Sequence, residues 1–247
     1  MAVKKSDFIL IDYVTKIDET GEIFDTTILD EATKSGIFKE NTVYEPMLVV
    51  VGERWVLKAL DDSLIGLKVG KPVTVEILPE DGFGLRDPNK IKLISIRKFK
   101  GQKTSPFPGA QIEIDGKLGT VRAVGAGRVQ VDFNLPLAGK TLIYNLTIKK
   151  ILKKRLDKIN ALIHRRIPTA NIEKIKVKAV KKKVDIELPE EAFYLEGVQF
   201  AKRGIAADIQ KYLEVDKISF IEIYRYAKPI QPPAATSLEQ TTDQADT

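Results

Sequence analysis

The segment Pro46–Gly84 reads PMLVVVGERWVLKALDDSLIGLKVGKPVTVEILPEDGFG, and the rest of the chain is interpreted from it. Its first apolar run, Met47–Val51, is short and continuous, which predicts a buried strand. Apolar and polar residues alternate over Val73–Ile77, which predicts a second, half-buried strand. Gly82–Gly84, with a phenylalanine between two glycines, predicts a closing loop.

Between the two strands, apolar residues recur at the spacing of one helix face: Val56, Leu57, Leu60, Leu64 and Ile65. This periodicity predicts a short helix with Lys58, Asp61 and Asp62 on its solvent side. Gly66 marks the expected end of the helix, because glycine readily adopts the left-handed conformation that terminates helices.

Four short blocks follow one another in this segment: Pro46–Gly52, Val56–Leu60, Gly66–Lys71 and Pro79–Gly84. In the order and spacing of these blocks, the segment resembles the FK506-binding-protein (FKBP) family of peptidyl-prolyl isomerases. The resemblance implies an α+β chain whose first domain is an antiparallel half-barrel sheet around a short helix.

Composition narrows the functional classes. The 247 residues are 43% hydrophobic, which supports ordinary globular cores, and the net charge of +6 allows a weak affinity for polyanions. The absence of cysteine excludes disulfides, thiol catalysis and thiolate metal sites, and the single histidine, His164, is expected to have a structural or surface role. With no apolar run near 18 residues and no signal peptide expected, we predict no membrane contact and a cytoplasmic location.

The part of the chain before Pro46 adds to the resemblance. Phe8–Ile17 predicts a strand, a turn follows with Gly21 at a position of positive φ, and the return strand carries Phe24–Thr27. Tyr13, a turn glycine and an F-D-T-T run match the family pattern. We expect an isomerase domain that comprises residues 1–86 and 140–152.

Residues 87–139 interrupt that domain and have all-β character. Asp115–Gly116 is a favoured hairpin dipeptide, and Gly125–Gly127 predicts a further turn between strands. The run resembles the insert-in-flap domain of SlyD-type and long archaeal FKBPs, which implies a chaperone module that holds unfolded chains. Phe99, Phe107 and Phe133 are the candidate chaperone surface; the alternative is that they pack within the insert's own core.

Residues 153–228 predict a C-terminal α-β-β-α-β domain large enough to fold alone, and 229–247 a disordered tail. Ile172–Val177 is expected to be its first strand, and its second helix is expected to break at Gly197 or Gly204. Its basic residues Arg165, Arg166 and Lys181–Lys183 predict either a solvated surface or a patch that docks on ribosomal RNA.

The resemblance also implies the site. Tyr13, Phe24, Asp25 and Phe83 are the expected catalytic residues, with Asp25 held by the Tyr13 hydroxyl and placed near the substrate carbonyl. The implied substrate-binding residues are Met47, Val56, Leu57, Leu60 and Tyr144. Prolyl isomerisation needs no nucleophile, so no cofactor and no metal are expected.

We therefore interpret the sequence as a peptidyl-prolyl cis-trans isomerase with chain-holding activity in its insert, whose partners are unfolded or proline-containing polypeptides. Two alternatives stay open: a holdase with little catalysis, and a ribosome- or RNA-associated folding factor acting through the C-terminal domain. The chain is expected to be a monomer or a homodimer.

Overall fold

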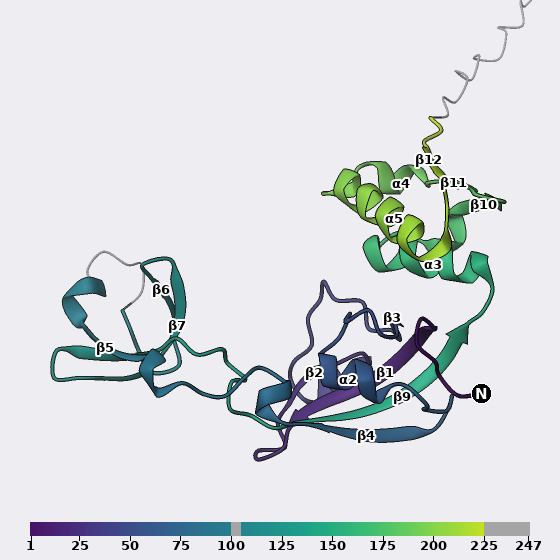
Figure 1. Ribbon diagram of the computed structural model, residues 1–247. Helices are drawn as coiled ribbons and strands as arrows, with labels where there is room; N and C mark the ends of the chain where they lie inside the picture. Colours follow the sequence, from purple (N-terminus) through teal and green to yellow (C-terminus); the bar gives the residue numbers. More distant parts are fainter. Residues whose placement is uncertain (100–104, 225–247) are drawn as a thin grey trace, which may run out of the picture.

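In the computed structural model, residues 1–99 and 105–224 are described. Their strands form three separate sheets, and Figure 1 shows each sheet in a lobe of its own. The expected α+β architecture is confirmed: nearly all strand pairs are antiparallel and helices are few. No helix in the described ranges has the length and apolar character needed to cross a membrane. The predicted tail, residues 229–247, lies outside the described residues.

The first lobe holds a five-stranded sheet in the order β2-β1-β9-β4, with β3 paired to the other half of β1. Its elements are β1 (Phe8–Ile17), β2 (Ile23–Thr26), α1 (Leu29–Lys34), β3 (Met47–Val50), α2 (Lys58–Ser63), β4 (Pro72–Ile77) and β9 (Leu142–Leu152). The central strand β1 begins with the continuous apolar run Phe8–Ile11, which is typical of a strand buried on both faces. Ile9 and Ile11 contact the core under α2, whereas Phe8 and Leu10 contact a different core.

The insert leaves this lobe after β4 through two 3-10 turns, η1 (Pro79–Asp81) and η2 (Pro88–Lys90). Its four-stranded sheet has the order β5-β8-β7-β6. The elements are β5 (Ile91–Ser95), the 3-10 turn η3 (Ile96–Phe99), β6 (Gln111–Ile114), β7 (Lys117–Gly125) and β8 (Arg128–Asp132). Asp115 and Gly116 have φ of 51° and 73°, as the predicted hairpin turn requires. Figure 1 shows this lobe projecting away from the first sheet.

The C-terminal lobe has three strands in the order β10-β11-β12, and β11 and β12 are parallel. Its elements are α3 (Arg155–Arg166), η4 (Ile172–Lys174), β10 (Lys176–Val180), β11 (Lys183–Glu187), α4 (Glu190–Phe193), α5 (Val198–Leu213) and β12 (Lys217–Ile221). The predicted helix break is at Gly197, whose φ is 73°, and Gly204 lies inside α5. Ile172–Val177 is not one strand: Asn171 caps a 3-10 turn through the Glu173 N–H, so β10 starts only at Lys176.

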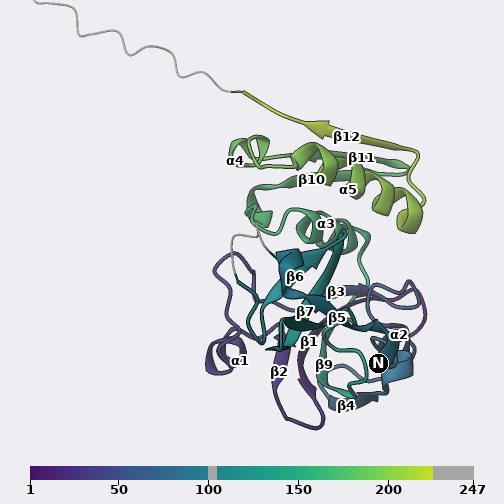
Figure 2. The ribbon, with the colours of Figure 1, turned by 90° about the vertical axis from the view of Figure 1, so that its left-hand side faces the viewer.

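The C-terminal lobe does not keep a core to itself. Its buried helix residues, Ile159 and Leu162 of α3 among them, pack in one cluster with Phe8, Leu48 and Val50 of the first lobe. Figures 1 and 2 both place α3 between the first sheet and the C-terminal strands. The two lobes therefore share a hydrophobic core, which we call the shared core. That the C-terminal domain folds alone stays a prediction.

Candidate functional site

The structure gathers the predicted aromatic and apolar site residues into one cluster of the first lobe. Tyr13 of β1, Leu60 of α2 and Tyr144 of β9 are buried there, and the rings of Tyr13 and Tyr144 lie 5.9 Å apart. The partly buried members of the predicted set pack against them: Phe24, Met47, Val56, Leu57 and Phe83. These residues therefore form one apolar, aromatic cluster, and its role as a substrate site stays a prediction.

Asp25 carries the charge at the edge of this cluster. It lies on β2, where its Cα is paired with that of Thr15 on β1, and its side chain is exposed. The Tyr13 hydroxyl donates a hydrogen bond of 2.8 Å to Oδ2 of Asp25, as the resemblance implied. Burial of the phenol, followed by the negative charge of Asp25, raises the pKa of Tyr13 well above its usual value. Tyr13 therefore stays a hydrogen-bond donor at every pH near neutrality.

The segment that carries Val56 and Leu57 is fixed by a buried carboxylate. Asp61 is 2% exposed, and its two oxygens accept hydrogen bonds from the backbone N–H groups of Gly52 (2.9 Å) and Arg54 (2.8 Å). The expectation that Asp61 faces solvent is wrong. Helix periodicity places Asp61 on the polar face of α2, but it gives no information about the preceding loop, which folds onto that face. Ile65, expected on the buried face, is 50% exposed because α2 ends at Ser63.

Leu57 is the N-cap residue of α2, and the first N–H groups of a helix have no partner inside it. Leu57 also packs against the apolar cluster. Phe83 reaches the same cluster from a loop closed by hydrogen bonds from the N–H groups of Gly82 and Gly84 to Leu78 and Pro79.

The insert presents its three predicted aromatic residues differently. Phe99 is 5% exposed in the insert core, so its assignment to a chaperone surface is wrong: it packs with Val121 and Val131 instead. Phe133 is partly buried, and a Cβ at Gly119 would lie 2.9 Å from its ring. Phe107 is 55% exposed and is the member of the three that faces solvent.

A buried carboxylate also joins the insert to the first lobe. Asp132, at the end of β8, is 2% exposed and forms ion pairs with Arg86 and Arg122. Its Oδ1 accepts hydrogen bonds from the backbone and side-chain nitrogens of Asn134. Burial alone raises the pKa of a carboxyl group, but here the hydrogen bonds from Asn134 and Arg122 and the charge of Arg86 outweigh it, so the pKa of Asp132 is lowered.

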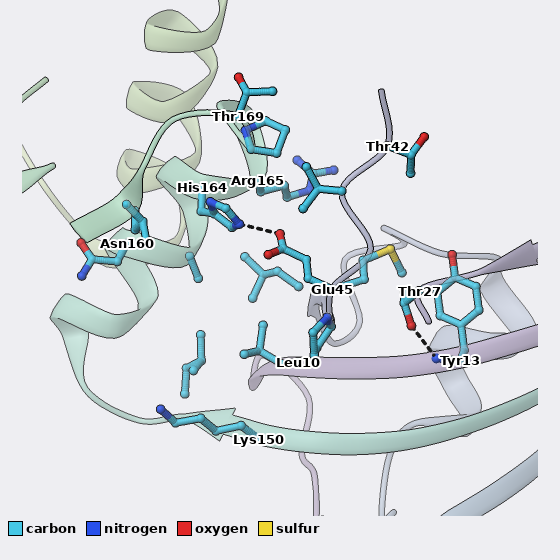
Figure 3. Close-up of a pocket in the computed structure, with 18 of the residues that line it drawn as sticks. Leu10, Tyr13, Thr27, Thr42, Glu45, Lys150, Asn160, His164, Arg165 and Thr169 are labelled. Atoms are coloured by element: carbon cyan, nitrogen blue, oxygen red, sulfur yellow. Dashed lines mark hydrogen bonds and ion pairs between the residues drawn. The ribbon is translucent and has the colours of Figure 1, made fainter. Parts of the chain in front are cut away.

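A cavity of about 760 Å³ lies between the first lobe and α3. We call it the interlobe groove. It includes Tyr13, Asp25 and Met47 from the predicted site, and its other walls come from residues 41–46 and from α3 with the segment after it. Figure 3 shows Glu45 reaching across it to His164, with 2.5 Å between Oε1 and Nε2.

Sequence reasoning did not find this groove. Glu45 and His164 are 119 residues apart, and no local motif relates them. Trp55 was missed as well: its Nε1 donates to the Tyr212 hydroxyl over 3.2 Å, and the Arg165 guanidinium lies 4.0 Å from the centre of its indole ring. The sequence contains a single tryptophan, and a half-buried Trp usually finds a polar partner for its N–H. This residue was therefore the signal from which a polar contact of Trp55 could have been expected.

The predicted basic patch is divided in the structure. Arg165 covers Trp55 and Arg166 binds Asp208, so both are engaged at the C-terminal end of α3. Arg155, at the other end of this 12-residue helix, contacts the Lys181 carbonyl, which places Lys181–Lys183 near the opposite end. The two groups are separated by roughly the 18 Å length of the helix and do not form one continuous patch.

Three family models match the chain. FKBP-type peptidyl-prolyl cis-trans isomerase matches residues 1–104, FKBP26 IF domain matches 92–137, and FKBP26 C-terminal matches 155–225. The short-type peptidyl-prolyl cis-trans isomerase of Methanocaldococcus jannaschii is 32% identical over 149 residues, which are 60% of this chain and 94% of that protein. The FKBP-type 16 kDa isomerase of Escherichia coli is 31% identical over 131 residues, 51% of this chain and 86% of that protein. The SlyD isomerase of Aeromonas hydrophila is 30% identical over 153 residues, 61% and 65% of the two chains.

Proposed function

Because the chain belongs to the FKBP-type peptidyl-prolyl cis-trans isomerase family, and is an enzyme acting on proline-containing polypeptides, we propose how its own residues accomplish that reaction. The observation that carries the proposal is the apolar, aromatic cluster with the Tyr13–Asp25 hydrogen bond at its edge. The prolyl bond rotates over a barrier of about 18–20 kcal/mol, because twisting the amide breaks its resonance. Uncatalysed exchange takes tens of seconds or longer, slow enough to limit folding.

In the proposed mechanism the prolyl ring packs on Leu60 and Tyr144, with Phe24 and Phe83 at the sides. A twisted amide has less charge separation than a planar one, so it loses less hydration on entering apolar surroundings. The cluster therefore favours the twisted bond over both planar forms, which is the requirement for catalysis. Each ~1.4 kcal/mol of this preference gives about a tenfold gain in rate.

Two polar groups orient the substrate. Asp25, fixed by Tyr13, places negative charge near the carbonyl group that precedes proline, and the Leu57 N–H donates to the substrate backbone. Neither group forms a covalent bond, so their contribution lies in position and electrostatics.

An assay of cis-to-trans conversion in a prolyl tetrapeptide tests this mechanism. Asp25→Ala is expected to lower kcat/KM by about tenfold, whereas Asp30→Ala, at an exposed aspartate of α1, should leave it unchanged. Equal rates for wild type and Asp25→Ala would remove Asp25 from the mechanism.

We propose further that the insert holds unfolded chains. Its support is an exposed apolar surface: Phe107 is 55% exposed, Leu118 72% and Leu93 64%. β5 and β6 are edge strands of the insert sheet, and an extended chain can add to such an edge. Holding and isomerisation then act on the same polypeptide in adjacent lobes.

An assay that measures how well the protein suppresses aggregation of a heat-unfolded protein distinguishes chain holding from isomerisation. Phe107→Ser combined with Leu118→Ser should weaken suppression, whereas Phe200→Ser, at an 82% exposed phenylalanine of α5, should not. Asp25→Ala should keep the suppression while its kcat/KM falls by about tenfold. A holdase with little catalysis would instead show suppression together with no isomerisation by the wild-type chain.

Ribosome binding through Lys181–Lys183, a cytoplasmic location and the oligomeric state remain predictions. Lys182 pairs with Asp216 at 3.7 Å, and this contact is exposed and open to exchange with phosphate. A ribosome association that weakens steeply with salt and is lost in Lys181→Ala/Lys183→Ala would support the first of these predictions.

A further inference from the structure

The interlobe groove begins at the proposed catalytic cluster and ends at the C-terminal lobe. Tyr13, Asp25 and Met47 line both the groove and the edge of that cluster. At the other end the groove is lined by Asn160 and His164 of α3. A chain that leaves the prolyl site past Asp25 therefore enters the groove directly.

The sheet edge at this point explains why the groove exists. Along one edge of β1, Val14–Lys16 pair with β2 and Phe8–Ile11 pair with β3, which leaves Asp12 and Tyr13 between the two partner strands. The chain leaves the sheet after Thr26 of β2 and returns at Met47 of β3. Tyr13 keeps its backbone hydrogen bonds, because its N–H donates to Thr27 Oγ1 (2.9 Å) and its carbonyl accepts from the Thr26 hydroxyl (2.8 Å). The gap between β2 and β3 at Tyr13 is thus a stable feature of this edge of β1.

The lining has the chemistry of a peptide site. Leu10, Leu48 and Leu152 supply apolar surface along one side, while side-chain amide and hydroxyl groups of Asn160, Thr42 and Thr169 supply hydrogen-bonding partners on the others. An extended chain needs both kinds of contact, since it buries apolar side chains while its backbone N–H and C=O groups must stay paired. The volume of about 760 Å³ lies within the roughly 300–1,000 Å³ of typical ligand pockets.

Contacts between the lobes hold the walls in place. Glu45 and His164 join residues 41–46 to α3, and the Arg165 guanidinium stacks 4.0 Å from the Trp55 ring centre. Behind these contacts lies the shared core, which fixes α3 against β3 and β9. A groove that exists before binding loses less conformational entropy when a flexible chain enters it.

We infer that the interlobe groove binds the segment of an unfolded polypeptide that flanks the prolyl bond, so that the C-terminal lobe forms part of the substrate site. The inference rests on the proposed function, because it places the prolyl bond at Tyr13 and Asp25. It assigns residues of α3 and of segment 41–46 to substrate selection: chains with apolar residues beside proline are preferred over short or strongly charged ones.

Filling the groove tests the inference. Thr42 and Thr169 are exposed lining residues from two different segments, so Thr42→Trp and Thr169→Trp should each narrow the groove without disturbing a core (Figure 3). The measurement is kcat/KM for a prolyl tetrapeptide and for the same sequence extended by about eight residues on either side, about 26 Å of chain each. The ratio of long to short substrate should fall about tenfold, equivalent to about 1.4 kcal/mol of binding.

Leu156→Trp is the matched control. Leu156 lies on α3, is 44% exposed and does not line the groove, so its variant should keep the wild-type ratio. If both filling variants keep that ratio as well, the inference is overturned while the isomerase mechanism stands. If the wild-type chain fails on the tetrapeptide itself, the proposed mechanism fails and the inference with it.

Chemical cross-linking detects a peptide bound in the groove independently of catalysis. The sequence contains no cysteine, so Thr169→Cys introduces a single thiol in the groove and Leu156→Cys a single thiol outside it. A prolyl peptide with a thiol-reactive group a few residues from proline should label position 169 faster than 156, and an excess of unmodified peptide should compete. Equal labelling overturns the inference, and so does a change of oligomeric state in the filling variants, which would assign the groove to a second copy of this chain.

Discussion

The hydroxyl group of Tyr13 lies 2.8 Å from Oδ2 of Asp25 and donates a hydrogen bond to it. The phenol is buried within the apolar cluster, whereas the carboxylate is exposed at its edge. A short aspartate side chain on a strand has several rotamers, and this bond selects one of them. The finding links an aromatic residue of the core to the one charged group proposed to face the substrate.

Removing that bond should lower activity without unfolding the protein. Tyr13→Phe keeps the ring and loses the donor, so a loss of about 1 kcal/mol and roughly fivefold in kcat/KM is expected in the tetrapeptide assay. Tyr194→Phe is the control, because Tyr194 is 74% exposed and lies far along the chain on the C-terminal lobe. An unchanged kcat/KM in Tyr13→Phe, with an unchanged melting temperature, would show that the bond has no role in catalysis.

The buried phenols predict a loss of stability in alkali. Burial first, and then the charge of Asp25, raise the pKa of Tyr13, and burial raises that of Tyr144. In the unfolded chain tyrosine ionises near pH 10, so stability is complete below about pH 10 and decreases as the pH rises toward the higher folded-state values. Urea unfolding followed from pH 9 upward, with Tyr13→Phe for comparison, measures this; the variant should lose less stability than wild type. Parallel curves would contradict the assignment.

Asp61 is expected to support the site through the loop that it binds. Asp61→Ala removes the acceptor of the Gly52 and Arg54 N–H groups, and Arg54 has a strained φ of 57° that those bonds help to hold. The expected cost is about 3 kcal/mol of unfolding free energy, with a fall in kcat/KM because Val56 and Leu57 follow this loop. Asp62→Ala, at the exposed neighbouring position, should change neither quantity. Similar melting temperatures for the two variants would refute this role.

Acid should loosen the junction between the insert and the first lobe. The pKa of Asp132 is lowered despite its burial, so its contribution to stability is present above the ordinary value of about 4 and is lost as the pH falls toward the lower folded-state pKa. Asp132→Asn should cost about 2 kcal/mol at neutral pH, less than for a fully buried pair because Arg86 and Arg122 are partly exposed.

Unfolding of the insert, monitored by amide hydrogen exchange, provides the measurement. The stability of Asp132→Asn should depend less on pH below about 4 than that of wild type. Asp81→Asn, at an exposed aspartate, serves as the control. If wild type and Asp132→Asn respond equally to acid, Asp132 is not the titrating group.

Trp55 should report on the contact between the lobes. It is the single tryptophan, and it packs against Tyr212 with ring centres 5.8 Å apart. Tyr212→Ala should expose the indole, shift its fluorescence to longer wavelength and lower stability by about 3 kcal/mol, since Tyr212 also contacts Phe8. Tyr194→Ala, which removes an exposed tyrosine, should leave the emission unchanged. An unshifted spectrum in Tyr212→Ala would contradict the packing described.

Much of the local structure was predictable because it depends on neighbours in sequence. Apolar runs and alternation located the strands of the first lobe, and Asp115–Gly116 specified a hairpin. Of the two glycines expected to break the second helix, Gly197 is the one where the break lies. The errors occur where a side chain interacts with the nearby backbone. Asn171 caps a 3-10 turn where a strand was expected, and Asp61 folds a loop over a helix face expected to be solvated. Polar side chains can form hydrogen bonds with the nearby backbone that compete with regular helices and strands, and hydrophobic periodicity does not reveal these bonds.

The candidate site was accessible from sequence to the extent that the resemblance covers it. Tyr13, Phe24, Leu60 and Tyr144 do lie in one cluster. Phe99 was misplaced, since an apolar residue in a small β domain can pack inward or face solvent and the sequence pattern around it is the same. The interlobe groove could not be found, because its walls come from segments more than one hundred residues apart.

By itself the sequence determined which strands and helices carry an apolar face, where many of the turns lie and which family pattern the chain carries. Burial and turn geometry follow from side-chain hydrophobicity and from the conformations open to glycine and asparagine or aspartate. The tertiary structure alone decided what each buried face packs against: Phe8 and Leu10 against the C-terminal lobe, Ile9 and Ile11 against the cluster under α2. The hydrophobic effect is non-directional, so a pattern states that a face is buried, and only packing specifies its partner.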